Sequence, residues 1–167
     1  MLKPTLAYQS PQTRPVLKHF LPWKTIHVEF GSAREYRAAL AKNNFAITTG
    51  VTKMLPYVRG VMGPREVTIY RQSVESVGFL GGVQLMEIHE RIDELGFMMC
   101  MPEIGPAVRL RYTHQPLGEK LFCAMKPLVG RMFVIENDGG SMILASSEAL
   151  LDGYWRLEDE FLLQKKI

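Results

Sequence analysis

Three side chains near the middle of the chain have types and a spacing that suit acid–base chemistry. They are Glu103, His114 and Glu119. A histidine beside a carboxylate can serve as a general base that the carboxylate orients. These residues would then form the centre of a small hydrolase-type enzyme. The same residues can also be explained without catalysis. Glu119 would then pair with an arginine across the hairpin, and His114 would be a solvated residue in a turn. We favour that second interpretation and assign no catalytic residue.

Two arginines in the same segment are candidates for binding an anion. Residues 108–113 alternate between apolar and polar types, which predicts a half-buried strand. Arg109 and Arg111 would then point to one face, where a phosphate or a carboxylate can accept two hydrogen bonds from an arginine. The turn residues of 114–118 and the alternation over 120–126 predict the second strand of a hairpin.

This segment also carries a local motif. It consists of Pro102-Glu103-Ile104-Gly105-Pro106, Arg109-Leu110-Arg111-Tyr112, Gln115-Pro116, Gly118-Glu119 and Ala124-Met125-Lys126-Pro127. The motif resembles a family of small uncharacterised bacterial proteins, and the resemblance extends more weakly from Trp23 to about Phe161. It implies a compact bacterial domain and no particular chemistry, because no activity is known for the family. Lys126 stands where the family pattern leads us to expect an acidic residue.

Local signals predict the elements that position these residues. Ser32 and Glu35 form a capping box that predicts a helix to about Lys42, and apolar residues at helical spacing predict the main helix over 83–95. The other predicted elements are strands over 23–30, 66–72, 97–101, 131–136, 141–145 and 160–164, a short helix through Met54 and Leu55, and a hairpin turn at 137–140. Short strands joined by tight turns are antiparallel. We therefore expect an α+β fold: a curved, mainly antiparallel sheet of about five to seven strands, packed by one main helix (about 83–95) and one or two N-terminal helices.

Length and composition bound the class of protein. The 167 residues, 47% of them hydrophobic and 22% charged, are typical of one globular domain that needs no metal or disulfide for stability. No apolar run approaches the roughly 20 residues that span a bilayer, so we expect no membrane association. Cys100 and Cys123 lie in predicted apolar strands and favour buried, reduced thiols. We therefore expect a cytoplasmic protein without a cofactor or a metal.

The charge of the chain is asymmetric. Residues 1–72 contain eleven Lys and Arg against three acids, a formal balance of +8, whereas residues 73–167 balance at −5. Such polarity can mark a surface that binds a polyanion, although folding can also mix the two halves on one surface. Residues 1–22 are basic and interrupted by prolines, so we expect an extended N-terminal arm ahead of a single domain over 23–167.

These observations lead to one favoured function and two alternatives. We expect a non-catalytic binding or accessory protein whose basic N-terminal half docks on an anionic macromolecule, either nucleic acid or an acidic protein surface. The alternatives are the hydrolase-type enzyme described above and a structural subunit or mobile-element-encoded inhibitor that acts only in a complex. The candidate anion-binding residues are Lys3, Arg14, Lys18, Lys24, Arg34, Arg37, Arg109 and Arg111, and the candidate aromatic contacts are Trp23 and Tyr112.

Overall fold

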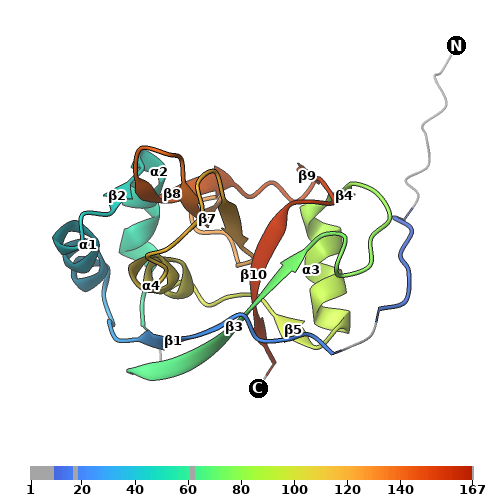
Figure 1. Cartoon of the computed structure of the whole chain (residues 1–167), viewed down its shortest axis with the longest axis horizontal. Helices are drawn as coiled ribbons and strands as arrows, with labels where there is room; N and C mark the ends of the chain where they lie inside the picture. Colours follow the sequence, from blue (N-terminus) through green and yellow to red (C-terminus); the bar gives the residue numbers. More distant parts are fainter. Residues whose placement is uncertain (1–9, 17–18, 61–62, 167) are drawn as a thin grey trace, which may run out of the picture.

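The computed structural model describes residues 10–16, 19–60 and 63–166. Their main feature is a curled sheet, here called the half-barrel (Figure 1). Its strands lie in the order β1 (Lys24–Val28), β3 (Arg65–Ser73), β10 (Glu160–Lys165), β6 (Lys120–Cys123), β7 (Arg131–Asn137), β8 (Met142–Glu148) and β2 (Ala46–Ile47). A short strand, β5 (Phe97–Met98), also pairs with β10, and β4 (Val83–Gln84) pairs with β9 (Tyr154–Trp155) in a separate ribbon.

The pairing is mainly antiparallel. Two pairs, β6 with β10 and β2 with β8, are parallel, and each has the long connection that parallel strands require. The helices are α1 (Ala33–Lys42), α2 (Thr49–Met54), α3 (Leu85–Glu94) and α4 (Ile104–Arg111), and a 3₁₀ helix, η1 (Leu55–Tyr57), follows α2. The predicted α+β class with a curved, mainly antiparallel sheet is confirmed.

The helix α4 overturns one prediction. We expected a strand over residues 108–113, but residues up to Arg111 are helical. The residues from Ile104 to Arg109 are all buried, so the helix lacks the polar stripe by which an amphipathic helix is recognised. Pro106 lies in the first turn, where the backbone N–H that proline lacks would have no partner within the helix.

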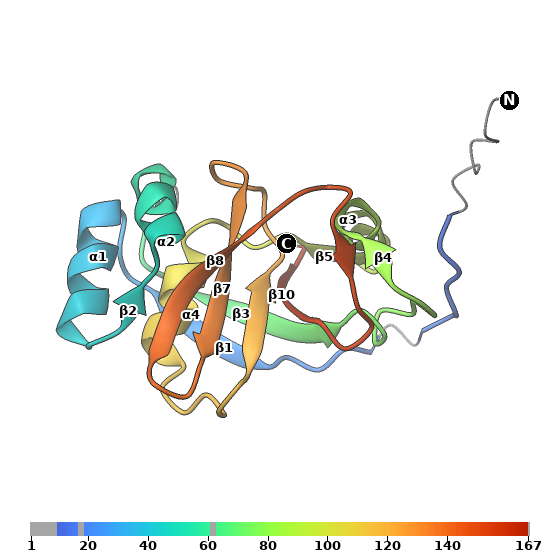
Figure 2. The same ribbon diagram turned by 90° about the horizontal axis from the view of Figure 1, so that it is seen from above.

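The half-barrel curls around α4. This helix contacts β1 at one edge of the sheet and β7 and β8 toward the other edge. In Figure 2 it lies beside β7 and β8. Close approach depends on Gly105, because a Cβ atom there would lie 2.7 Å from the side chain of Phe133 on β7. The predicted main helix, α3, packs instead at the other end, against β4 and β5.

Local hydrogen bonds hold two features that the sequence predicted, the start of α1 and the turn between β7 and β8. The Ser32 hydroxyl accepts from the Glu35 backbone N–H at 3.3 Å, and the Glu35 carboxylate accepts from the backbone N–H of Gly31 at 3.1 Å. The turn between β7 and β8 is held by Asp138, whose carboxylate accepts from the N–H groups of Gly140 and Ser141 at 2.9 and 3.0 Å. These bonds satisfy backbone donors that would otherwise lack partners.

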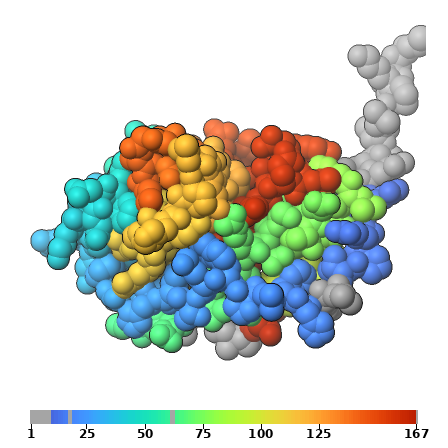
Figure 3. Space-filling view, viewed as in Figure 1, coloured from blue at the N-terminus to red at the C-terminus, as the bar shows by residue number. Residues whose placement is uncertain are grey.

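The described part of the N-terminal arm lies against the domain. Thr13 forms an antiparallel bridge with Phe79, and the ring of Phe20 contacts that of Phe97 edge-on at 5.0 Å. Figure 3 shows this segment in dark blue along the surface of the domain. Among the described residues, no helix is both long enough and apolar enough to cross a membrane.

Candidate anion-binding surface

The three hydrolase candidates each have a separate environment. Glu103 is completely buried and its Oε1 lies 2.6 Å from Nη2 of Arg65. His114 is exposed, and its Nδ1 lies 3.1 Å from the Thr113 hydroxyl. Glu103 and His114 therefore contact different residues, and no hydrogen bond or ion pair joins the two among the described residues.

Glu119 completes a clamp that joins distant strands. Its Oε1 lies 2.6 Å from Nη2 of Arg71 on β3, and its Oε2 accepts from the Tyr112 hydroxyl at 2.9 Å. Arg71 also pairs with Glu160 on β10. Burial alone would lower the pKa of Arg71, but the hydrogen bonds and charges of Glu160 and Glu119 raise it above its usual value. This geometry suits an ion-pair network that ties elements together.

Arg109 was predicted to bind an anion, but it lies inside the protein. Its side chain is 0% exposed. Nη1 donates to the Gln115 side chain at 2.6 Å and to the carbonyl of Glu136 at 3.2 Å, and Nη2 donates to the carbonyl of Tyr112. Burial lowers its pKa to about 10. A guanidinium surrounded by neutral oxygens in this way supports the chain that connects α4 to the sheet and leaves no face for a macromolecule.

Arg111 points away from Arg109. The two residues were expected on one face of a strand, but residues two apart on a helix do not face each other. Arg111 instead forms an exposed ion pair with Glu29, next to β1. Folding thus mixes the two halves of the sequence at several points, since Arg65 and Arg71 of the first half pair with acids of the second.

One group of cations takes no part in these ion pairs between the two halves, and we call it the basic end. It comprises the exposed residues Arg34, Arg37 and Lys42 of α1, Lys53 of α2 and Arg59 after η1. Residues 31–64 contain these five cations and one acid, Glu35. Among the described residues, none of the five forms an ion pair with a carboxylate. Figures 1 and 2 place α1 and α2 together at one extremity of the molecule.

The sequence builds this surface by helical periodicity. Tyr36 and Leu40 are the buried residues of α1, so Arg34 projects on the opposite side and Arg37 on an exposed flank. The antiparallel bridge between Ser32 and Arg59 holds Arg59 beside the start of the same helix. The acid of this region, Glu35, caps that helix, and its hydrogen bonds to the Ser32 side chain and the Gly31 backbone lower its pKa.

An exposed aromatic ring adjoins these cations. Tyr57 of η1 is 59% exposed, follows Lys53 by four residues in one continuous helical segment and precedes Arg59 by two. Rings this exposed contribute little to a core, so Tyr57 is free to stack on a ligand. The basic end therefore combines unpaired positive charge with a stacking surface.

The other predicted aromatic contacts lie elsewhere. Trp23 and Tyr112 pack edge-on at 5.0 Å, with the Lys24 ammonium 5.7 and 5.4 Å from the two ring centroids. The guanidinium of Arg71 also lies 5.9 Å from the Trp23 ring. Trp23 and Lys24 are half-buried, so the group extends the Glu119 clamp rather than the basic end.

The arm contributes unevenly. Lys3 and Lys18 lie outside the described residues. Arg14 is exposed, and its backbone N–H donates to the carbonyl of Gly78 at 2.8 Å, next to Phe79 and far along the chain from α1. Of the predicted cations, Arg34 and Arg37 thus belong to the basic end.

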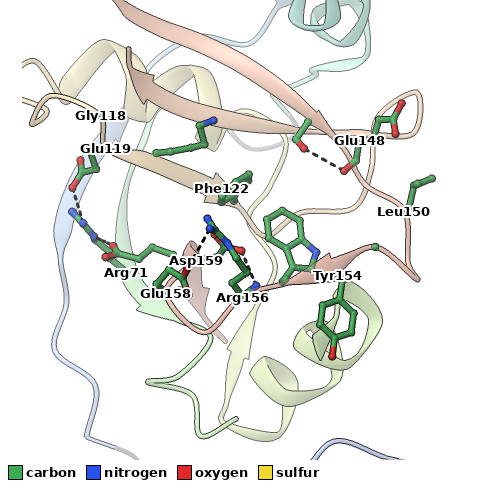
Figure 4. A pocket seen from close by; sticks show the side chains of 15 residues that line it. Arg71, Gly118, Glu119, Phe122, Glu148, Leu150, Tyr154, Arg156, Glu158 and Asp159 are labelled. Carbon is green, nitrogen blue, oxygen red and sulfur yellow. Dashed lines mark hydrogen bonds and ion pairs between the residues drawn. The ribbon is translucent and has the colours of Figure 1, made fainter. Parts of the chain in front are cut away.

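A cleft of about 740 Å³ adjoins the Glu119 clamp. Figure 4 shows Arg71 and Glu119 at one end of it and Leu150 and Tyr154 at the other. Several of its charged side chains pair with one another, as in the contact of 3.4 Å between Arg156 and Asp159. Across the described residues, no three His, Cys, Asp or Glu side chains gather so as to hold a metal ion.

Sequence reasoning missed Lys42, Lys53 and Arg59 as members of one site. All three were included in the charge balance, and the concentration of cations over 31–64 was the signal that could have singled them out. Comparisons with protein-family models, curated proteins and solved structures find no match to this chain.

Proposed function

We propose that this protein is a non-catalytic binding protein that docks on single-stranded nucleic acid through its basic end. The observation that carries the proposal is the set of five exposed cations without carboxylate partners in the described chain, next to an exposed tyrosine. Positive charge attracts the phosphate backbone whatever its sequence. Aromatic rings add stacking on bases, which is the usual way of holding a single strand.

An acidic protein surface would bind the same five cations but would not need the exposed tyrosine ring. The exposed ring of Tyr57 favours nucleic acid, because unstacked bases offer it an apolar face. The single strand is favoured over a duplex for the same reason, since stacked bases in a helix are inaccessible to a tyrosine.

The direct test measures binding of a short oligothymidylate at several salt concentrations. The logarithm of the association constant should fall linearly with the logarithm of salt, by about 0.7 for each phosphate contact. Replacing both Arg34 and Arg37 with Gln should reduce that slope by about 1.4. The matched control is Lys126→Gln with Lys165→Gln, which removes the same charge from two exposed lysines of the second half.

The tyrosine supplies a second measurement. Tyr57→Ala should weaken binding by about 1–3 kcal/mol, and Tyr57→Phe should keep most of the affinity because stacking needs the ring alone. Binding that is insensitive to salt, or that the control variant weakens as much as the Arg34 and Arg37 variant, would contradict the proposal.

A second candidate function rests on exposed apolar side chains at the opposite end. Leu150, Leu151 and Tyr154 are each more than half exposed, and the backbone N–H of Met86 on α3 donates to the carbonyl of Leu151 at 3.1 Å. Apolar residues gathered in this way are typical of protein interaction sites. They favour a subunit that acts in a complex. A native pull-down with and without nuclease separates the two functions, because protein partners would survive nuclease treatment.

A further inference from the structure

A pocket between α3 and the strand β5 is lined almost entirely by apolar side chains. Its volume is about 580 Å³, inside the range of roughly 300–1,000 Å³ that is usual for small-molecule sites. Its wall includes Met98, Met99 and Met101, together with Pro127 and Leu128. Methionine side chains are flexible and polarisable, so they adapt to the shape of an apolar ligand.

The polar groups of this pocket leave one positive charge uncompensated. Asp93 lines the pocket, but its carboxylate lies 2.6 Å from the ammonium of Lys166. Lys126 also lines it, is exposed and has no carboxylate partner among the described residues. The charge of the site therefore favours an anionic group at Lys126.

A histidine adds an unsatisfied hydrogen-bonding atom. His89 of α3 lines the pocket, and its Nε2 is buried without a partner in the described part of the chain. Buried polar atoms without a partner are rare in native structures and cost stability. Burial lowers the pKa of His89, which favours the neutral form of the ring. A bound polar group could satisfy it.

We infer that this pocket binds a small amphipathic carboxylate of the fatty-acid class, with its chain against Met98, Met99 and Met101 and its carboxylate at Lys126. The inference is independent of nucleic-acid binding, because the basic end lies on other elements. A straight chain suits the site because its lining is apolar and adaptable. A single carboxylate suits the single uncompensated cation.

The experiment uses the full chain with labelled methionine methyl groups and titrates it with octanoate and decanoate below the concentration at which these ligands aggregate. The NMR signals of Met98, Met99 and Met101 should shift saturably. Each methylene that enters the pocket should tighten binding about fourfold, so decanoate should bind roughly 15-fold more tightly than octanoate. Shifts confined to other methionines, or an absence of chain-length dependence, would overturn the inference.

The charge is tested by ligand and by variant together. Lys126→Gln should weaken decanoate binding by up to about fivefold, as is usual for an exposed ion pair, and leave binding of the uncharged analogue decanol unchanged. Lys165→Gln, which removes an exposed lysine outside this pocket, should change neither. Equal affinity for decanoate and decanol in the native chain would overturn the assignment of Lys126. The native chain's methyl titration needs no variant, so a folding defect in any substitution does not affect it.

Discussion

Arg34 and Arg37 on α1 differ from Arg71 and Arg109 in the half-barrel in what surrounds their guanidinium groups. The first two are exposed and lack carboxylate partners in the described chain. Arg71 pairs with Glu119 and Glu160, and Arg109 donates to an amide side chain and to carbonyl oxygens. An arginine whose guanidinium bonds to groups of its own chain in this way stabilises the fold. An arginine whose donors meet water remains available to a ligand.

The comparison also explains why net charge alone is a poor guide to a binding surface. The first half of the chain has a formal net charge of +8, but Arg65 and Arg71 form ion pairs with Glu103 and Glu119. The excess positive charge remains exposed on α1, whose polar side faces water. If this distinction is right, substitutions in the two regions should separate stability from binding.

The largest expected effect is that of Arg109. Arg109→Met would leave the carbonyls of Glu136 and Tyr112 and the amide of Gln115 buried without their donor. Each buried acceptor that loses its donor costs about 1–3 kcal/mol. Urea unfolding should show that loss in the free energy of unfolding. A cost below about 1 kcal/mol would show that Arg109 is not a structural arginine.

Next in size is the clamp. Arg71→Met should destabilise the protein by about 2 kcal/mol, because Glu119 and Glu160 would be left close together without the cation between them. Adding Glu119→Gln should restore part of that stability by removing one of the two negative charges. Thermal unfolding of the single and double variants provides the measurement, and additive losses would argue against a shared clamp.

A smaller effect concerns pH. Burial raises the pKa of the Cys123 thiol to about 12 from its ordinary value of 9.0. The unfolded chain loses this proton near pH 9 while the folded chain keeps it, so stability is full below about pH 9 and falls as the pH rises toward 12. By pH 10 the loss is about 1.4 kcal/mol. Cys123→Ala should reduce this alkaline decline without abolishing it, because burial also raises the pKa of Cys100, whereas the Arg34 and Arg37 variant should leave it unchanged.

The smallest effect on stability belongs to the basic end. Arg34→Gln with Arg37→Gln should change the free energy of unfolding by less than about 0.5 kcal/mol, as is usual for exposed side chains without partners. The same variant should lose affinity for the oligothymidylate. A large loss of stability there would erase the distinction between the two regions.

Much of the local structure was predictable. The capping of α1 by Ser32 and Glu35, and the turn at residues 137–140, depend on hydrogen bonds between near neighbours. The left-handed residue Gly96, with a φ of +85°, ends α3 where glycine is favoured. The candidate site was predictable only in part. Arg34 and Arg37 could be named, but nothing in their spacing distinguished them from Arg109.

The sequence by itself determined where α1 begins, which of its sides faces water and where the chain turns, because these features depend on residues within one or two turns of each other. Only the tertiary structure decided that residues 104–111 form a helix and that Arg109 is buried. A strand and a fully buried helix carry similar apolar residues. What separates them here is the half-barrel, which surrounds α4 and supplies partners for Arg109 from β7 and β8, strands that come later in the chain.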